Sequence, residues 1–264
     1  MLLADCNSCF GLCCVALPYA KSADFAKNKD GGKPCQNLDD SYRCTIHSTL
    51  REQGFKGCTV YECYGAGQKV SQHTFNGSWR DFPDASNEMF DVFPIMQQLH
   101  EMLYYLHESL QLEEALPLHH ALSDAIISTE ELTKQTSKKI LQIDVQSHRI
   151  IVNELLLETS KLVRKNEKAE RQANPRIMDL IGANLKGKVF KGSDLRGALL
   201  IATDLRNADL RKCDFIGADL RDANLCGADL RESIFLTQAQ LNAANGDMNT
   251  KLPVHLKRPP HWQS

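Results

Sequence analysis

A large apolar residue returns at every fifth position in the C-terminal part of the chain, twelve times without a break. A period of five matches neither the 3.6-residue repeat of a helix nor the two-residue repeat of a strand. A mostly small residue lies two positions before each large one, so a locally strand-like segment must alternate with a turn. We therefore expect stacked coils around a buried column, with Arg, Lys and Asp outside. The series is Leu180, Leu185, Phe190, Leu195, Leu200, Leu205, Leu210, Phe215, Leu220, Leu225, Leu230 and Phe235.

The run ADLRDANLCGADLRES, at residues 218–233, resembles the pentapeptide-repeat family, whose pattern is A(D/N)LXX. The resemblance covers about Met178 to Phe235. It implies a right-handed, four-sided β-helix with four units per turn, and therefore about three coils. Lys188 stands where most units carry a small residue, so we expect it to distort one face. The segment after Phe235 breaks the period and predicts a C-terminal capping helix.

Composition divides the chain into parts. Residues 1–72 are rich in Cys and Gly, and residues 84–170 contain neither and carry apolar residues at helical spacing. Ser86 is a candidate N-cap of the first helix, which either begins near Phe93 or kinks at Pro94. The predicted fold class is multidomain α+β: a Cys-rich metal-binding domain (1–72), a small helical bundle (84–170), a right-handed quadrilateral β-helix with its cap (176–247) and a Pro-rich tail (248–264).

Eight of the ten cysteines lie between Cys6 and Cys63. The first residues carry no basic stretch and no apolar core of a secretory signal, so we expect a cytoplasmic location. A reducing cytoplasm disfavours disulfides and favours metal or redox chemistry, whereas four disulfides would be the alternative in a secreted chain. Thiolates are soft ligands that suit tetrahedral zinc or an iron–sulfur cluster.

The cysteine spacing, C-x2-C-x3-CC from Cys6 to Cys14, resembles a cysteine-cluster family with the signature CxxCxxCC that is associated with zinc or iron chelation. The second spacer here has three residues instead of two. The resemblance implies a bound metal, either an iron–sulfur cluster or zinc, and leaves open whether it is structural or redox-active. Adjacent side chains point apart in a regular backbone, so Cys13 and Cys14 either serve two metals or one of them is structural. The candidate ligands are Cys6, Cys9, Cys13, Cys14, Cys35, Cys44, Cys58 and Cys63, with His47 as either a further ligand or a core residue.

The two remaining cysteines belong to the repeat. Cys213 falls on a small inward position, where a buried filler is expected, and Cys226 falls on an outward position as a surface thiol.

Three classes of function are compatible with this organisation. The favoured one is a metal-binding interaction or adaptor protein with a protein partner on the solenoid face. The alternative is an iron–sulfur-dependent redox or methyl-transfer enzyme, because the cysteine signature also occurs in a flagellin lysine methylase; no catalytic residues are identifiable. A DNA-gyrase-protecting DNA mimic is disfavoured, because residues 176–247 carry ten basic and ten acidic residues. The formal charge of -2 argues against direct nucleic-acid binding, and no apolar run is long enough for a membrane.

Overall fold

The computed structural model describes residues 2–167 and 180–262. The chain forms two compact units, of which the first comprises Met1–Leu110 and Leu118–Leu156 and the second Gln111–Pro117 and Leu157–Ser264. The predicted domain boundaries at residues 170 and 176, and Met178, where the resemblance to the repeats begins, lie outside the described residues. The predicted division into a Cys-rich domain, a bundle, a repeat region and a tail stays a prediction.

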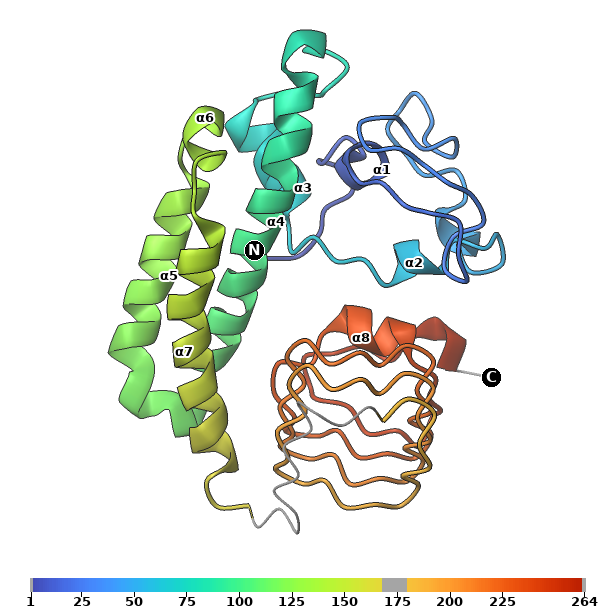
Figure 1. Ribbon diagram of the computed structural model, residues 1–264, viewed down its shortest axis with the longest axis vertical. Helices are drawn as coiled ribbons and strands as arrows, with labels where there is room; N and C mark the ends of the chain where they lie inside the picture. Colours follow the sequence, from blue (N-terminus) through green and yellow to red (C-terminus); the bar gives the residue numbers. More distant parts are fainter. Residues whose placement is uncertain (1, 168–179, 263–264) are drawn as a thin grey trace. The chain divides into compact units, whose positions relative to one another are not determined.

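The N-terminal part of the first unit is built from turns and very short helices (Figure 1). Its helices are α1 (Leu12–Ala16), η1 (His47–Thr49), α2 (Lys56–Thr59), α3 (Ala66–Lys69), η2 (Val70–Thr74) and η3 (Pro83–Ala85). Two isolated antiparallel bridges, Tyr19 with Lys29 and Leu38 with Cys44, tie the loops between them. Leu12 and Val15 of α1 are fully buried in one apolar cluster with Phe93, so this irregular segment packs on the first long helix.

Four longer or connecting helices follow: α4 (Ser86–Leu110), α5 (His119–Thr133), α6 (Ser137–Ile140) and α7 (Val145–Arg164), with η4 (Glu113–Leu118) between α4 and α5. Helix α4 runs through Pro94, so the predicted start near Phe93 is wrong. Ser86 is the first helical residue and donates its hydroxyl hydrogen to the carbonyl of Pro83 instead of capping the helix. The division between the two units falls within α7.

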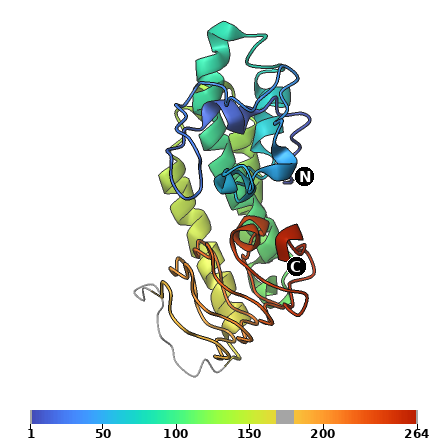
Figure 2. The same ribbon diagram turned by 90° about the vertical axis from the view of Figure 1, so that its right-hand side faces the viewer.

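The repeat region of the second unit is a stack of coils (Figures 1 and 2). Within the repeats, isolated parallel bridges join residues that are 20 positions apart, for example Asn184 with Asp204 and Asp204 with Asn224. Twenty residues are four five-residue units, so one coil contains four units. Between coils, the amide of Leu185 donates to the carbonyl of Asp204 at 2.8 Å, and the amide of Asp204 donates to the carbonyl of Ala183 at 2.9 Å. The apolar series lies inside, as its period requires.

The predicted fold class of α+β with a right-handed quadrilateral β-helix is wrong. The described residues contain no β-strand and no sheet, and their regular secondary structure is helical. The reason lies in the backbone of each unit. A residue with a left-handed φ recurs at every fifth position from Gly182 to Glu232, such as Ala202 at 54° and Asn207 at 55°. This turn leaves one bridging residue per unit, which is too short a run for a strand.

The ladder between coils continues through the unit of Lys188, whose carbonyl accepts from the amide of Asp209 at 3.0 Å. Lys188 itself is exposed. The hydrogen bonds between these coils therefore show no sign of the distortion that we expected Lys188 to cause.

One face of the stack is covered by the end of α7, which the period did not predict. Asp214 is fully buried and forms an ion pair with Arg196 at 3.2 Å, and Ser160 of α7 hydrogen-bonds to the same carboxylate. Arg164 of α7 reaches Asp194 at 3.5 Å. Residues that the repeat assigns to the outside are thus enclosed where the helix packs on the coils.

The last coil is closed by α8 (Gln238–Ala243) and the C-terminal segment. Thr237 and Gln240 form a capping box at the start of α8, and the side chain of Gln240 also donates to the carbonyls of Phe215 and Ala218. The indole of Trp262 is buried in the same core and donates to the carbonyl of Ala244 at 2.9 Å. These contacts cover the apolar end of the column.

Candidate metal centre

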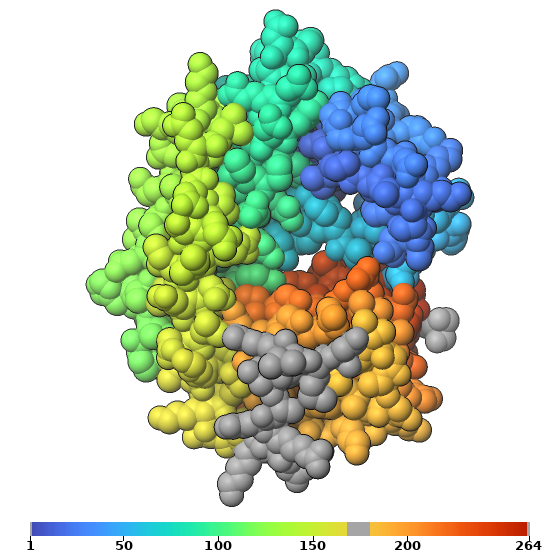
Figure 3. Space-filling model, viewed as in Figure 1, coloured from blue at the N-terminus to red at the C-terminus, as the bar shows by residue number. Residues whose placement is uncertain are grey.

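All eight N-terminal cysteines line a single cavity of about 500 Å³ in the first unit. They come from segments as far apart in sequence as Cys6 and Cys63, and His47 also lines the cavity. The space-filling view shows an opening among the blue segments of this unit (Figure 3). All ten cysteines of the chain are free thiols. The structure thus gathers the sequence-predicted candidate ligands around one space, in which His47 is exposed and the cysteines range from exposed to buried.

Two turns of the same design hold Cys9 and Cys63. Each cysteine is followed by an aromatic residue and a glycine, both with left-handed φ: 49° and 65° at Phe10 and Gly11, and 51° and 84° at Tyr64 and Gly65. Left-handed φ is uncommon for an aromatic residue. The turn directs two backbone amides at the Cys9 sulfur, from Gly11 and Leu12, and two at the Cys63 sulfur, from Gly65 and Gly67. Amide donors to sulfur stabilise a thiolate, which is the metal-binding form. At Cys63 they offset only part of the effect of burial, which raises the pKa of this thiol.

Neighbouring thiols in the cavity divide their acidity unequally. A hydrogen bond from Cys6 lowers the pKa of Cys9, while the same contact raises the pKa of Cys6. Likewise, the contact between Cys13 and Cys14, whose sulfurs are 3.9 Å apart, lowers the pKa of Cys14 and raises that of Cys13. In each pair, one thiol therefore loses its proton more readily than an isolated thiol would, and the other loses its proton less readily.

Two polar side chains that the sequence did not single out, Tyr19 in the cavity lining and Lys29 near the thiols, interact with cavity cysteines. The hydroxyl of Tyr19 lies 3.3 Å from the sulfur of Cys35, and burial raises the pKa of Tyr19. The ammonium of Lys29 donates to the carbonyls of Val15 and Leu17 at 3.0 and 2.6 Å and lowers the pKa of Cys14 through its charge.

Tyr61 is a further tyrosine of the cavity lining that the cysteine spacing could not reveal. Its hydroxyl oxygen is buried and has no hydrogen-bond partner among the residues that the structure describes. Burial raises the pKa of Tyr61, and Cys9, Cys13 and Cys63 interact with it electrostatically. A buried hydroxyl without a partner is costly, so a group that enters the cavity would gain a donor there.

The donor set fits a soft metal, but the side chains are not already convergent. Eight thiols in one cavity match the ligands of zinc and iron–sulfur sites. Within residues 2–167 and 180–262, however, no three His, Cys, Asp or Glu side chains are arranged to hold one ion. Burial raises the pKa of Cys58 to about 12, so an unassisted thiolate is disfavoured at this position. Binding a metal would require rotation of cysteine side chains and loss of their protons.

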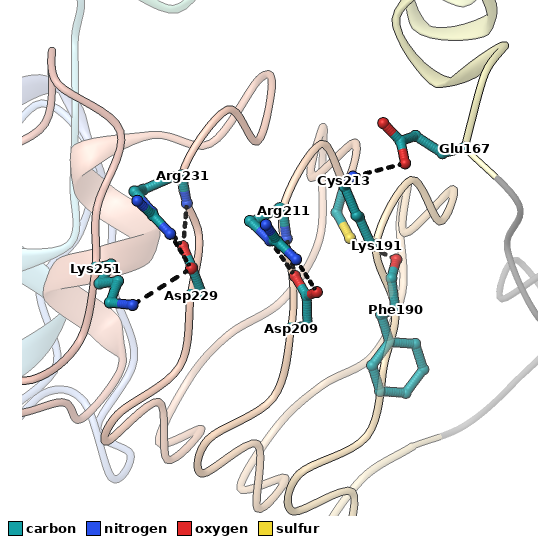
Figure 4. A network of polar contacts seen from close by, with 9 residues as sticks. All are labelled: Glu167, Phe190, Lys191, Asp209, Arg211, Cys213, Asp229, Arg231 and Lys251. Atoms are coloured by element: carbon teal, nitrogen blue, oxygen red, sulfur yellow. Dashed lines mark hydrogen bonds and ion pairs between the residues drawn. The ribbon is translucent and has the colours of Figure 1, made fainter.

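The two cysteines of the repeat take no part in this cavity. Cys213 is fully buried, and its thiol donates to the carbonyl of Phe190 at 3.0 Å, which confirms its predicted role as a buried filler (Figure 4). Cys226 is half-buried.

The outer faces of the coils carry Asp and Arg in matched pairs. Each of four Asp carboxylates accepts hydrogen bonds from the Arg two residues later, with shortest ion-pair distances of 2.6 to 2.7 Å. Figure 4 shows two such pairs, Asp209 with Arg211 and Asp229 with Arg231, on successive coils. Lys251 also reaches Asp229, at 3.8 Å. The charges are thus neutralised locally, residue by residue.

No helix in the described ranges combines the length and apolar character needed to cross a bilayer.

Comparisons with known proteins identify the repeats. The family of pentapeptide repeats matches in eight copies, over residues 179–211, 193–232 and 208–245, which confirms the predicted repeats. A crystal structure of a pentapeptide repeat protein from Nostoc Pcc 7120 is similar, with 33% sequence identity and a TM-score of 0.23, over 38% of this chain and 88% of the other. The cysteine-cluster family is not shown by these comparisons.

The whole chain has a relative in Bacillus subtilis (strain 168), the uncharacterized protein YybG. The two are 63% identical over 266 residues, which cover 99% of this chain and 95% of the relative. The chain therefore belongs to the family of YybG, and its C-terminal part consists of pentapeptide repeats.

Proposed function

We propose that this chain is a metal-binding pentapeptide-repeat protein whose cysteine-lined cavity holds zinc or an iron–sulfur cluster. The observation that carries the proposal is the assembly of eight free thiols from distant segments around one cavity. Turns and very short helices form these loops, so a bound metal would supply folding free energy that such short elements lack. A reducing compartment such as the cytoplasm would keep the thiols available.

The repeat region supports a role in protein interaction. Its first coil carries exposed apolar residues at outward positions where most units have Asp, Asn, Lys or Arg: Ile181, Val189 and Leu199. Exposed apolar groups on a repeat surface favour a protein partner. We infer that the repeats bind a protein at this first coil, while the cysteine cavity carries the metal.

The size of the cavity favours a second candidate, an enzyme. A volume of about 500 Å³ exceeds the need of one ion and falls within the range of small-molecule sites. Aromatic side chains, including Phe25, Phe55 and Phe93, line it beside the thiols. An iron–sulfur cluster with redox or methyl-transfer chemistry would use such space for a substrate.

The charge pattern gives no support to a DNA mimic. A mimic needs a face on which carboxylates stand unpaired, as phosphates do on a duplex. The four described Asp–Arg pairs instead place a guanidinium beside each of these carboxylates.

The test replaces two cavity thiols and uses the replacement of one thiol in the repeat as its control. We expect Cys6→Ser combined with Cys9→Ser to lower the metal content, because it removes a close thiol pair and the amide-bonded sulfur of Cys9. Cys226→Ser is the matched control and should retain the metal content of the unaltered protein. Metal content is measured by elemental analysis on protein purified without oxygen. Full metal retention in the double variant would overturn the proposal.

A further inference from the structure

We propose that Gln68, Ser71 and Gln72 are positioning residues that hold the N-terminal segment, residues 3–10, at the cysteine cavity. This inference rests on the proposed metal-binding function and names the groups that set the place of two candidate ligands. It follows from hydrogen bonds between one helix face and the backbone of that segment.

The three side chains lie on the helical turns that follow Cys63 in the chain. Helix α3 continues directly into η2, so residues 66–74 form one helical stretch. Positions that are three and four residues apart share a helix face, which places Gln68, Ser71 and Gln72 side by side. All three therefore face the same neighbouring segment.

Gln68 binds the N-terminal segment through both ends of its side-chain amide. Its Oε1 accepts from the amide of Asp5 at 3.1 Å, and its Nε2 donates to the carbonyl of Leu3 at 2.7 Å. Two bonds from one planar amide fix the direction of the backbone as well as its place. Gln68 also lines the cavity, and the stretch that it holds leads directly into Cys6.

Gln72 and Ser71 bind the segment after Cys6. The Nε2 of Gln72 donates to the carbonyl of Ser8 at 2.8 Å. The hydroxyl of Ser71, which is fully buried, donates to the carbonyl of Cys9 at 3.1 Å. One helix face thus holds the backbone on both sides of Cys6.

Cys6 itself lies in a short turn that its neighbours close. The carboxylate of Asp5 accepts from the amide of Asn7 at 3.0 Å and from the hydroxyl of Ser8 at 2.7 Å. The guanidinium of Arg43 donates to the side chain of Asn7. Local hydrogen bonds therefore shape the turn, while contacts with other segments determine where it lies.

Cys9 is anchored by packing as well as by hydrogen bonding. Its side chain is 7% exposed, and a Cβ atom at Gly67 would lie 2.8 Å from the Cβ of Cys9. The helix backbone thus contacts this cysteine directly. The indole of Trp79 donates to the carbonyl of the next residue, Phe10, at 2.9 Å. Loss of one hydrogen bond should leave Cys9 in place.

Cys6 lies in an exposed stretch instead. Residues 3–7 are exposed, including the apolar side chain of Leu3, so burial contributes little to the position of this stretch. Polar contacts must locate it. We therefore expect loss of the Gln68 amide to release Cys6 while Cys9 stays anchored.

A fixed backbone makes it easier for thiols to gather around an ion. When the backbone is held, Cys6 needs only a side-chain rotation to become a ligand. A free segment must also lose backbone entropy when it binds. Groups that orient metal ligands typically change metal affinity by about 10- to 100-fold. We expect an effect of this size from Gln68.

The test measures Co²⁺ affinity in Gln68→Ala. Reduced, metal-free full-length protein is titrated with Co²⁺ alone under exclusion of oxygen, and thiolate-to-metal absorption gives the Kd. We expect the Kd to rise about 10- to 100-fold. The matched control is Gln135→Ala, because Gln135 is also half-buried and its amide donates to a backbone carbonyl, that of Glu131, at 3.1 Å. The control should bind Co²⁺ as the unaltered protein does.

Gln72→Ala is a milder second variant. Gln72 is exposed and contributes one hydrogen bond to the segment, so its removal leaves the core intact. We expect its Kd to rise less than that of Gln68→Ala and more than that of the control.

Alkylation separates positioning from general destabilisation. At saturating Co²⁺, alkylation read by peptide mass spectrometry should be faster at Cys6 in Gln68→Ala than in the unaltered protein, and unchanged at Cys58. A loss of overall stability would expose both thiols alike.

An unchanged Kd in Gln68→Ala, or equally faster alkylation at Cys6 and Cys58, would overturn the positioning role and leave the proposed function standing. No bound Co²⁺ in the unaltered protein would overturn the proposed function and this inference with it.

Discussion

The repeat region and the cysteine region stabilise their interiors in opposite ways. In the repeats, a residue's role follows from its place in a five-residue unit: Leu210 is buried in the column, and Asp209 outside it pairs with Arg211 two positions later. In the cysteine region, Cys9 and Cys63 meet although 54 positions separate them, and no period relates them. The first region is specified locally and the second by long-range contacts.

This difference indicates which of the two regions depends on a ligand for its stability. The coils close their own hydrogen bonds from one turn to the next and bury a continuous apolar column. The loops around the cysteine cavity enclose thiols and the unpartnered hydroxyl of Tyr61. We therefore expect the repeats to fold without a ligand and the cysteine region to depend on its metal.

Metal removal should produce the largest difference in stability between the cysteine region and the repeats. Treatment of the loaded protein with a chelator is expected to abolish hydrogen-exchange protection in the cysteine loops, because a structural metal contributes on the order of 10 kcal/mol to a small thiolate domain. Protection of the coils should remain unchanged. Hydrogen exchange read by mass spectrometry resolves the two regions in one sample. Equal loss of protection in both would show that the regions do not differ as argued.

A core truncation in the repeats should destabilise the coils and leave the cysteine region unchanged. We expect this effect to be smaller than that of metal removal. Leu210 is fully buried, so Leu210→Ala is expected to lower the free energy of unfolding of the coils by about 2–5 kcal/mol. Leu199, which is 43% exposed, provides the control Leu199→Ala, with little expected change. Urea unfolding measures both variants, and their metal content should equal that of the unaltered protein. A loss of metal in Leu210→Ala would couple two regions that we treat as independent.

Lowering the pH should affect the two regions at different pH values. We expect this effect to be smaller than those of metal removal and core truncation. The hydrogen bond from Arg206 lowers the pKa of Asp204 to about 2, and Arg211 and Arg231 lower those of Asp209 and Asp229. A pKa below the ordinary value of 3.8 gives stability that is present above about pH 4 and is lost as the pH falls toward 2. Burial raises the pKa of Asp214, so its protonation partly offsets this loss.

In the cysteine region, protons compete with the metal for thiolates, so metal release is expected at a higher pH than the loss of coil stability. Far-ultraviolet circular dichroism and metal release, followed in parallel from pH 7 to pH 2, give the order of the two events. Metal release and loss of coil structure at the same pH would contradict this expected order.

Much of the repeat could be predicted because the signal is local. The period identified most of the buried positions, including Cys213, and the small residue that most units carry. It could not predict that α7 would cover Arg196 and Asp214, because that contact depends on a distant helix. The strand content was overestimated, because a left-handed residue in each unit interrupts the extended backbone.

For the candidate site, residue type and clustering identified the cysteines that line the cavity, since thiols so concentrated have few other uses. Tyr19, Lys29 and Tyr61 carry no such signal, because tyrosine and lysine occur in every kind of surface and core. Only the repeated Cys–aromatic–Gly sequence at Cys9 and Cys63 could have indicated that two cysteines share one kind of turn.

The most direct test of the central claim is metal and acid-labile sulfide analysis of the unaltered protein purified without oxygen, with a visible spectrum of the same sample. The account predicts bound metal: iron with sulfide and a broad visible absorption for an iron–sulfur centre, or zinc in a colourless sample for a structural site. Protein that contains neither metal and gains none on reconstitution would contradict it.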